Sequence, residues 1–357
     1  MSKITIAIDA MSGDRGVDVV VPASLRIIEE YPNLRLILVG DRSTVLSTLA
    51  KYKAGESDQI KVHHASEVVA MDELPSQALR YKKDSSMRVA LNLVKEGAAD
   101  ACVSAGNTGA LMATARFVLK TIPGIDRPAI LTTFPSRNEY GRVRVLDLGA
   151  NVDSSAHVLF QFAVMGSVLT SAMDSIAAPK VALLNIGAEE IKGNEQVKET
   201  ARLLSESKTI NYIGFAEGDD IFKGIADVIV CDGFVGNVAL KAIEGLARYI
   251  GTVIKEAFKS NIFSKLAALC SYFVMKSIKK RLDPSRYNGA SLLGLRGIVI
   301  KSHGGTTVRG FETAIKHAMD EVKHNVPELI KTEVERAFSK EHVSLKQKVL
   351  RKLSDLL

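Results

Sequence analysis

The chain has 357 residues and a formal net charge of +7, with 46% hydrophobic residues, 6% aromatic residues and no tryptophan. These totals predict one large α/β domain or two lobes around an aliphatic core. The three cysteines, Cys102, Cys231 and Cys270, are far apart, which excludes a disulfide framework and a metal-type spacing and predicts a reducing cytosol. Ser2 and Lys3 lead straight into a predicted strand, so we expect no signal peptide, and no apolar run reaches the length of a membrane span.

Strands and helices alternate along the chain, and polar turns that contain glycine follow many of the strands. Predicted strands cover 3–8, 34–40, 60–64, 101–103, 130–134, 142–148, 181–185, 212–215 and 228–231; helices are predicted from about Val19, Pro75, Ser85 or Ser86 and Ala110, and over 156–170 and 195–205. This alternation is typical of an α/β, doubly wound, mostly parallel sheet of the Rossmann-like type. Such folds bind ligands at the carboxyl ends of the strands, so we expect a site along that edge.

The predicted strand 101–103 runs into a turn and an apolar helix, and this stretch (99–120) is the centre of the functional hypothesis. Small residues in the turn let the backbone approach a ligand, and a helix start presents unpaired N–H groups. Together they would form an anion cradle over Ser104, Gly106, Asn107 and Thr108. A tight strand-to-helix turn without a ligand explains the pattern equally well.

Other strand ends carry further candidates for binding a substrate or phosphate. They are Asp9 and Asp14 after the first strand, Asp147 and Asn151 after 142–148, Asp232 after 228–231, and His303. Aspartates in such places also form turns and caps, and a histidine after a strand is often a hydrogen-bonded edge residue.

The familiar nucleotide and nucleophile motifs are missing. The sequence contains no G-x-G-x-x-G turn, no G-x-x-x-x-G-K-[ST] loop and no G-x-S-x-G elbow. Hydride transfer and nucleotide hydrolysis are therefore disfavoured. The remaining Gly, Asn and Asp turns, with Lys192 in one of them, suit the binding of a small oxyanion and an acyl group without a protein nucleophile.

Six ordered motifs resemble the bacterial phosphate acyltransferases of phospholipid synthesis. They are Asp9–Asp14, the run from Pro75 to Met87 continuing into Val103–Ala113, Leu146–Asp153, Asn185–Asn194, Cys231–Lys241 and Gly297–Gly304. The resemblance spans the chain from Ile4 to about Ala318, and it departs from the family at Ser12, where glycine is usual.

The resemblance implies a fold like that of isocitrate and isopropylmalate dehydrogenases. It implies transfer of a fatty acyl group from an acyl carrier protein thioester to inorganic phosphate, giving acyl-phosphate by direct attack of phosphate, with no cofactor and no metal. It also identifies Lys192 and Asn237 as catalytic. On spacing alone Asn237 could equally be a helix N-cap, whereas a lysine at a helix start is unfavourable unless it has a function. A covalent route through Cys102 or Cys231 is conceivable, although both lie in apolar strands.

The net positive charge is concentrated in one amphipathic segment, 246–284. Eight basic residues and one acid lie between Leu246 and Arg281, beside two apolar stripes at helical spacing. The segment is either a helical pair packed on the sheet or on a second subunit, or a protruding hairpin in an anionic membrane interface. The resemblance favours membrane docking and a homodimer, with the membrane contacts at Val253, Ile254, Phe258, Ile262, Phe263 and Leu266. Without an interleaved aromatic platform, nucleic acid is not expected as a partner.

We therefore expect a single acyltransferase domain over 1–312, including 246–284, and a helical C-terminal tail over 313–357 that Pro327 breaks and that ends in a basic helix, 345–357. The predicted location is cytoplasmic, peripherally associated with the inner face of the cell membrane. The acidic carrier could be steered by Arg80, Lys82, Lys83 or the amphipathic segment. Two alternatives stay open: a phosphotransacetylase-like transfer that uses acyl-coenzyme A, and a non-catalytic module that binds an acyl carrier.

Overall fold

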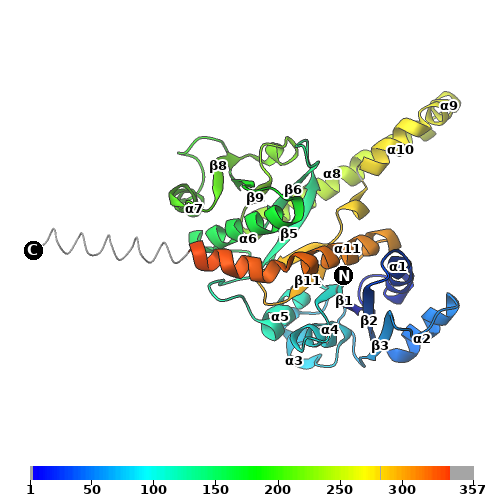
Figure 1. Cartoon of the computed structure of the whole chain (residues 1–357). Coiled ribbons are helices and arrows are strands. Elements are labelled where there is room, and N and C mark those ends of the chain that lie inside the picture. Colours follow the sequence, from blue (N-terminus) through cyan, green and yellow to red (C-terminus); the bar gives the residue numbers. More distant parts are fainter. Residues whose placement is uncertain (1–2, 282, 338–357) are drawn as a thin grey trace, which may run out of the picture.

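The computed structural model describes residues 3–281 and 283–337 (Figure 1). One sheet of eleven strands lies at its centre, in the order β3-β2-β1-β4-β11-β10-β5-β6-β9-β7-β8. The strands are β1 (Ile4–Asp9), β2 (Leu34–Gly40), β3 (Ile60–His64), β4 (Ala101–Ser104), β5 (Ala129–Pro135), β6 (Arg142–Leu146), β7 (Lys180–Leu184), β8 (Asn211–Ala216), β9 (Val228–Val230), β10 (Ala290–Leu293) and β11 (Ile298–Lys301).

The sheet consists of two parallel blocks that run in opposite directions. Strands β3, β2, β1, β4 and β11 are parallel, and so are β6, β9, β7 and β8. Between the blocks, β10 is antiparallel to β11 and β5, and β5 is antiparallel to β6. The predicted fold class is confirmed, but the expectation of one common edge is wrong, because β1 and β4 end at the opposite edge from β6 and β9.

Helices cover both faces, because alternate side chains of each strand point to opposite sides. Ile6 and Ile8 belong to one buried cluster and Ala7, between them, to another. One face carries α1 (Val17–Glu30), α2 (Arg42–Lys51), α6 (Ala156–Asp174), α7 (Glu195–Glu206) and α11 (Val308–His324); the other carries α3 (Pro75–Tyr81), α4 (Ser86–Lys95), α5 (Thr108–Leu119) and the start of α8 (Gly233–Lys259). Short 3₁₀ turns cover Gly218–Phe222 and Pro284–Arg286.

Two expectations about helices need correction. By length and composition α6 could cross a membrane, although most of it is buried in this fold, where it packs on β6, β7 and β9. The boundary expected between 312 and 313 falls inside α11, whose Ala314 and Ile315 are fully buried. This helix ends at Asn325, which adopts a left-handed conformation, and a further helix covers 326–337. Residues 313–334 therefore pack in the α/β body, and 345–357 lie outside the described residues.

A helical segment extends from the body (Figure 1). It comprises the second half of α8, then α9 (Ile262–Cys270) at the far end, then α10 (Tyr272–Arg281). Its apolar side chains are exposed; Phe263 on α9, for example, is 80% exposed. We call residues 246–281 the hairpin.

Candidate active site

The turn after β4 presents three free backbone donors at the start of α5. The Asn107 side chain caps this helix by accepting the Ala110 N–H at 3.0 Å, and its amide group donates to the carbonyls of Met71 and Glu73. Within the described residues, the N–H groups of Asn107, Thr108 and Gly109 have no hydrogen-bond partner. Adjacent free N–H groups at a helix start bind anions.

A buried polar network holds this turn in place. The Ser104 hydroxyl donates to Asp9 Oδ2 at 2.6 Å and accepts the Gly106 N–H at 3.1 Å. The Ser12 hydroxyl donates to the Asp9 carbonyl and accepts the Ala105 N–H, both at 2.9 Å. Burial raises the pKa of Asp9, and its Oδ1 has no partner. Asp9 and Ser104 thus shape the turn, and Ser12 joins the turns after β1 and β4.

Lys301, which was not predicted, places a buried ammonium group beneath the same turn. It ends β11 in register with Ser104, is 8% exposed, and donates from Nζ to the carbonyls of Ser302 and, at 3.5 Å, of Ala105. Burial lowers the pKa of Lys301 to about 8, against the opposing influence of Asp9 and Asp14. The group therefore stays mostly protonated at neutral pH. The signal in the sequence was a lysine that directly follows an apolar strand.

The turn after β11 packs against the turn after β1. The Asp14 N–H donates to the Gly304 carbonyl at 3.0 Å. The His303 ring accepts the Gly305 N–H on Nδ1 at 3.0 Å, and the backbone N–H of His303 donates to Asn288 Oδ1. Asp14 and His303 are exposed here, at the same sheet edge as the anion turn.

Asp147 organises the loop after β6 at the opposite edge. Its carboxylate accepts the N–H groups of Ile130, Ala150 and Asn151 and the side-chain amide of Asn151, at 2.7–3.1 Å. The Asn151 amide also donates to the Pro128 carbonyl at 2.8 Å. Burial raises the pKa of Asp147, against these hydrogen bonds. Asp147 therefore acts on its own loop.

A cavity of about 210 Å³ separates α5 from this loop. One wall is the α5 face, the other the loop, and the lining residues are Thr108, Gly109, Met112, Ala113, Arg116, Pro128, Ile130, Gly149, Ala150 and Asn151. The cavity brings together Thr108 and Asn151, two of the predicted residues. Arg116, its one charged lining residue, was not predicted, although it lies two turns beyond Thr108 on the same helix.

The start of α8 is pressed against the back of the loop. Asp232 caps α8 by accepting the Val235 N–H at 2.9 Å, so Asn237, further along the helix, is not an N-cap. A methyl group at Gly236 would lie 1.9 Å from the Asp147 carbonyl oxygen. A methyl group at Gly149 would lie 3.5 Å from the Asn237 side chain. Asn237 is therefore adjacent to the loop that lines the cavity.

Lys192 lies in the loop between β7 and α7. Asn185 shapes this loop by donating to the carbonyls of Gly187 and Lys192. Lys192 Nζ is 2.8 Å from Glu189 Oε2, and this hydrogen bond raises the pKa of Lys192. This ion pair is within its own loop, so the role of Lys192 at the cavity stays a prediction. The cap of α7 is Asn194, two residues later.

Cys102 and Cys231 are poor nucleophiles where they lie. Both are buried, and burial raises the pKa of each thiol well above its usual value. Because the thiolate is the reactive form, this environment disfavours a covalent route. In 3–281 and 283–337, no cluster of three or more His, Cys, Asp or Glu side chains is placed to hold a metal ion.

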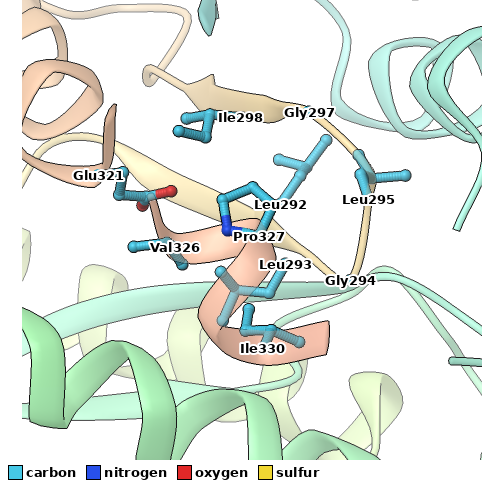
Figure 2. Close-up of a pocket in the computed structure, with 10 residues that line it drawn as sticks. All are labelled: Leu292, Leu293, Gly294, Leu295, Gly297, Ile298, Glu321, Val326, Pro327 and Ile330. Atoms are coloured by element: carbon cyan, nitrogen blue, oxygen red, sulfur yellow. The ribbon is translucent and has the colours of Figure 1, made fainter. Parts of the chain in front are cut away.

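A second cavity, shown in Figure 2, is too small for a substrate. Its volume of about 10 Å³ has room for roughly one water molecule. Apolar side chains of β10, β11 and the 326–337 helix line it, with Glu321 as the one charged lining residue. We regard it as a packing defect near the core.

Residues 4–329 match the family model described as "Fatty acid synthesis protein". The chain is 59% identical over 334 residues to the phosphate acyltransferase of Legionella pneumophila (strain Paris), covering 94% of this chain and 97% of that one. It is 58% identical over 333 residues to the phosphate acyltransferase of Alkalilimnicola ehrlichii, covering 93% and 96%.

Among solved structures, a phosphotransacetylase from Streptococcus pyogenes superposes with a TM-score of 0.62 at 19% identity, covering 90% of this chain and 94% of that one. A branched-chain phosphotransacylase from Enterococcus faecalis gives 0.54 at 12% identity, covering 89% and 99%. At these identities the likeness shows a shared fold.

Proposed function

The chain belongs to the phosphate acyltransferase family, and from this premise we propose that it transfers a fatty acyl group from an acyl carrier protein thioester to inorganic phosphate, giving acyl-phosphate. Acyl transfer to phosphate follows from the family. The carrier-bound donor and the acyl-phosphate product are the finer parts of the proposal.

One observation carries the proposal: of the three residues with free N–H groups, Thr108 and Gly109 line the cavity, and the buried Lys301 ammonium contacts the same turn at the Ala105 carbonyl. These donors fit a phosphate dianion, and the cavity beside them has room for the thioester end of a substrate. A phosphate oxygen attacks the thioester carbonyl carbon, the C–S bond breaks, and the leaving thiolate takes up the proton that the hydrogen phosphate dianion loses. Because a thiol has a pKa of about 8.5, it leaves without a dedicated acid.

In this proposal Lys192 and Asn237 stabilise the negative charge that develops on the carbonyl oxygen. Asn237 lies beside the Gly149–Asn151 loop, where its amide can donate without adding charge. Lys192 carries a full positive charge, since its hydrogen bond with Glu189 raises its pKa. Removing one such donor typically costs about 10²–10³ in kcat.

The test measures acyl-phosphate formation from an acyl-carrier thioester, with and without phosphate. Lys192→Ala and Asn237→Ala should each lose at least about 10²-fold in turnover at an unchanged melting temperature. Lys198→Ala is the matched control, because Lys198 forms the same i,i+3 pair, with Glu195, on the adjacent helix. An active Lys192→Ala enzyme would make that assignment wrong, and a wild type that forms no acyl-phosphate, or prefers acyl-coenzyme A, would refute the proposed reaction.

We further propose that the hairpin docks on the anionic inner face of the cell membrane. Ile262, Phe263 and Leu266 at its far end are 71%, 80% and 62% exposed, and lysines flank them. Apolar insertion beside basic groups is how interfacial helices bind membranes. Phe263→Ser/Leu266→Ser should abolish flotation with anionic vesicles, whereas Tyr52→Ser, which changes an exposed aromatic residue on the body, should not. Flotation of the double variant would contradict this proposal.

We also propose a homodimer, because α8 carries an exposed apolar stripe that begins close to the α/β body. Phe234, Val238 and Tyr249 are 62%, 55% and 67% exposed, which a second copy would cover. Sedimentation should show a dimer for the wild type and a monomer for Val238→Glu/Tyr249→Glu. A wild-type monomer would refute it.

A further inference from the structure

The exposed stripe of α5 changes character along its length. Its first two turns present Thr108, Gly109 and Ala113 beside the cavity. Arg116 and Phe117 in its last turn, and Lys120 at its C-cap, are exposed to solvent. From Thr108 to Arg116 the helix rises about 12 Å. The cavity thus extends along α5 from the free N–H groups toward the basic C-terminal end of this helix.

Cations surround an exposed aromatic ring at that end. Phe117 is 51% exposed, with the Arg88 guanidinium 4.9 Å and the Lys120 ammonium 4.8 Å from its ring centre. Arg116 makes one long contact, 3.5 Å to the Asp126 carbonyl, and Arg296 donates to the Thr121 carbonyl at 3.0 Å. We call Arg88, Arg116, Phe117, Lys120 and Arg296 the α5 patch.

No described residue neutralises the charge of the α5 patch. In the described part of the protein, no carboxylate lies within 4.0 Å of its four cations. Arg202 on α7, by contrast, pairs with Glu199 and Glu206, and Lys323 on α11 pairs with Asp320. An uncompensated basic surface attracts an acidic partner and speeds its association.

We propose that the α5 patch is the docking surface for the acidic acyl carrier protein, and that its thioester-bearing arm enters the cavity along α5. The proposal rests on the proposed function and names the surface where that partner binds. A carrier held about 12 Å from the anion turn stays outside while the thioester on its flexible arm reaches the phosphate. Arg116, which belongs both to the α5 patch and to the cavity wall, is placed for the phosphodiester that links the arm to the carrier, because a guanidinium matches phosphate geometry.

The test reverses two charges of the α5 patch that do not line the cavity, in Arg88→Glu/Lys120→Glu. Position 88 tolerates glutamate, because it is the third residue after the Ser85 cap of α4, where a carboxylate favours the helix. The matched control is Arg35→Glu/Lys61→Glu, the same charge change at exposed positions of β2 and β3. Each protein is assayed for binding of the acyl carrier protein and for phosphate-dependent turnover of two donors, the carrier thioester and acyl-N-acetylcysteamine.

We expect the α5 patch variant to bind the carrier at least tenfold more weakly and to raise the KM for the carrier thioester at least tenfold. Its kcat/KM for the small thioester and both activities of the control should stay within twofold of the wild type. Unchanged carrier binding would overturn the proposal, as would an equal loss with both donors. Loss of vesicle or RNA binding without loss of carrier binding would assign the α5 patch to another anion and also overturn it. If the wild type binds the carrier through the α5 patch yet turns over neither donor, docking stands and the proposed reaction fails.

Discussion

Gly236 offers a direct test of whether the start of α8 belongs to the active site. A methyl group there would lie 1.9 Å from the Asp147 carbonyl oxygen, whereas side-chain Cβ atoms do not approach closer than 3.0 Å. In Gly236→Ala, α8 must therefore move away from the loop after β6 by about 1 Å. Asn237 is the next residue, so its amide moves with the helix.

A displacement of about 1 Å at a catalytic group can lower the rate about 10²-fold. Forcing a methyl group into packed backbone also costs about 1–3 kcal/mol of stability. We expect Gly236→Ala to fold with a lower melting temperature and to lose about 10²-fold in kcat/KM with phosphate and the acyl thioester. The assay is acyl-phosphate formation per folded molecule, beside thermal unfolding.

Gly245→Ala on the same helix is the control, because beyond the adjoining backbone of α8 no atom of the described residues lies within 4 Å of a methyl group there. Alanine should stabilise that position by about 0.5–1 kcal/mol and leave activity unchanged. A Gly236→Ala enzyme with a lower melting temperature but wild-type kcat and KM would refute the reasoning, since the start of α8 would then matter only for stability.

Three further predictions concern groups that are buried. Cys102→Ala/Cys231→Ala should keep wild-type kcat, because both thiols are held protonated; a loss of 10²-fold or more would revive the covalent route. Lys301→Met should lower the free energy of unfolding by about 1–3 kcal/mol, because the buried carbonyls of Ala105 and Ser302 lose their donor. Asp9→Asn/Lys301→Met should lose less than the sum of the two single variants in urea titrations, because the charge of Asp9 acts on Lys301. Additive losses would contradict the coupling. Burial raises the pKa of Glu321 from 4.5 to about 7. The contribution of its neutral form to the free energy of unfolding is therefore fully present below pH 4.5 and is lost as the pH rises through 7. Glu321→Gln should therefore unfold at higher urea concentration than the wild type at pH 8 and at the same concentration at pH 4; a constant difference would refute this.

The sequence predicts the local elements well because the signals that define them are local. All nine predicted strands are present, and the Ser85 cap and the helix after Ser104 lie where turn and cap residues placed them. Strand direction is a long-range property. Strand β10 was not predicted, because its four residues are largely buried and do not alternate between apolar and polar. It pairs antiparallel with β11 and with β5, and β5 pairs antiparallel with β6. These pairings reverse the direction of the strands in the second block. Lys301 escaped for the same reason, since its burial depends on β4 and on Asp9 about 290 positions away.

The structure also separates two roles that motif residues share. Asp9, Ser104, Asn107, Asp147 and Asp232 were candidates for substrate binding, yet most of their hydrogen bonds go to backbone groups of the turns around them. Polar side chains that accept hydrogen bonds from buried N–H groups fix a loop, and the same side chains are then not free to bind a ligand. What such loops leave for a ligand is backbone, here the free N–H groups of 107–109, together with the few side chains that line the cavity. A dianion bound mainly by backbone needs glycines and correctly shaped turns more than charged side chains, which is the pattern found in this sequence.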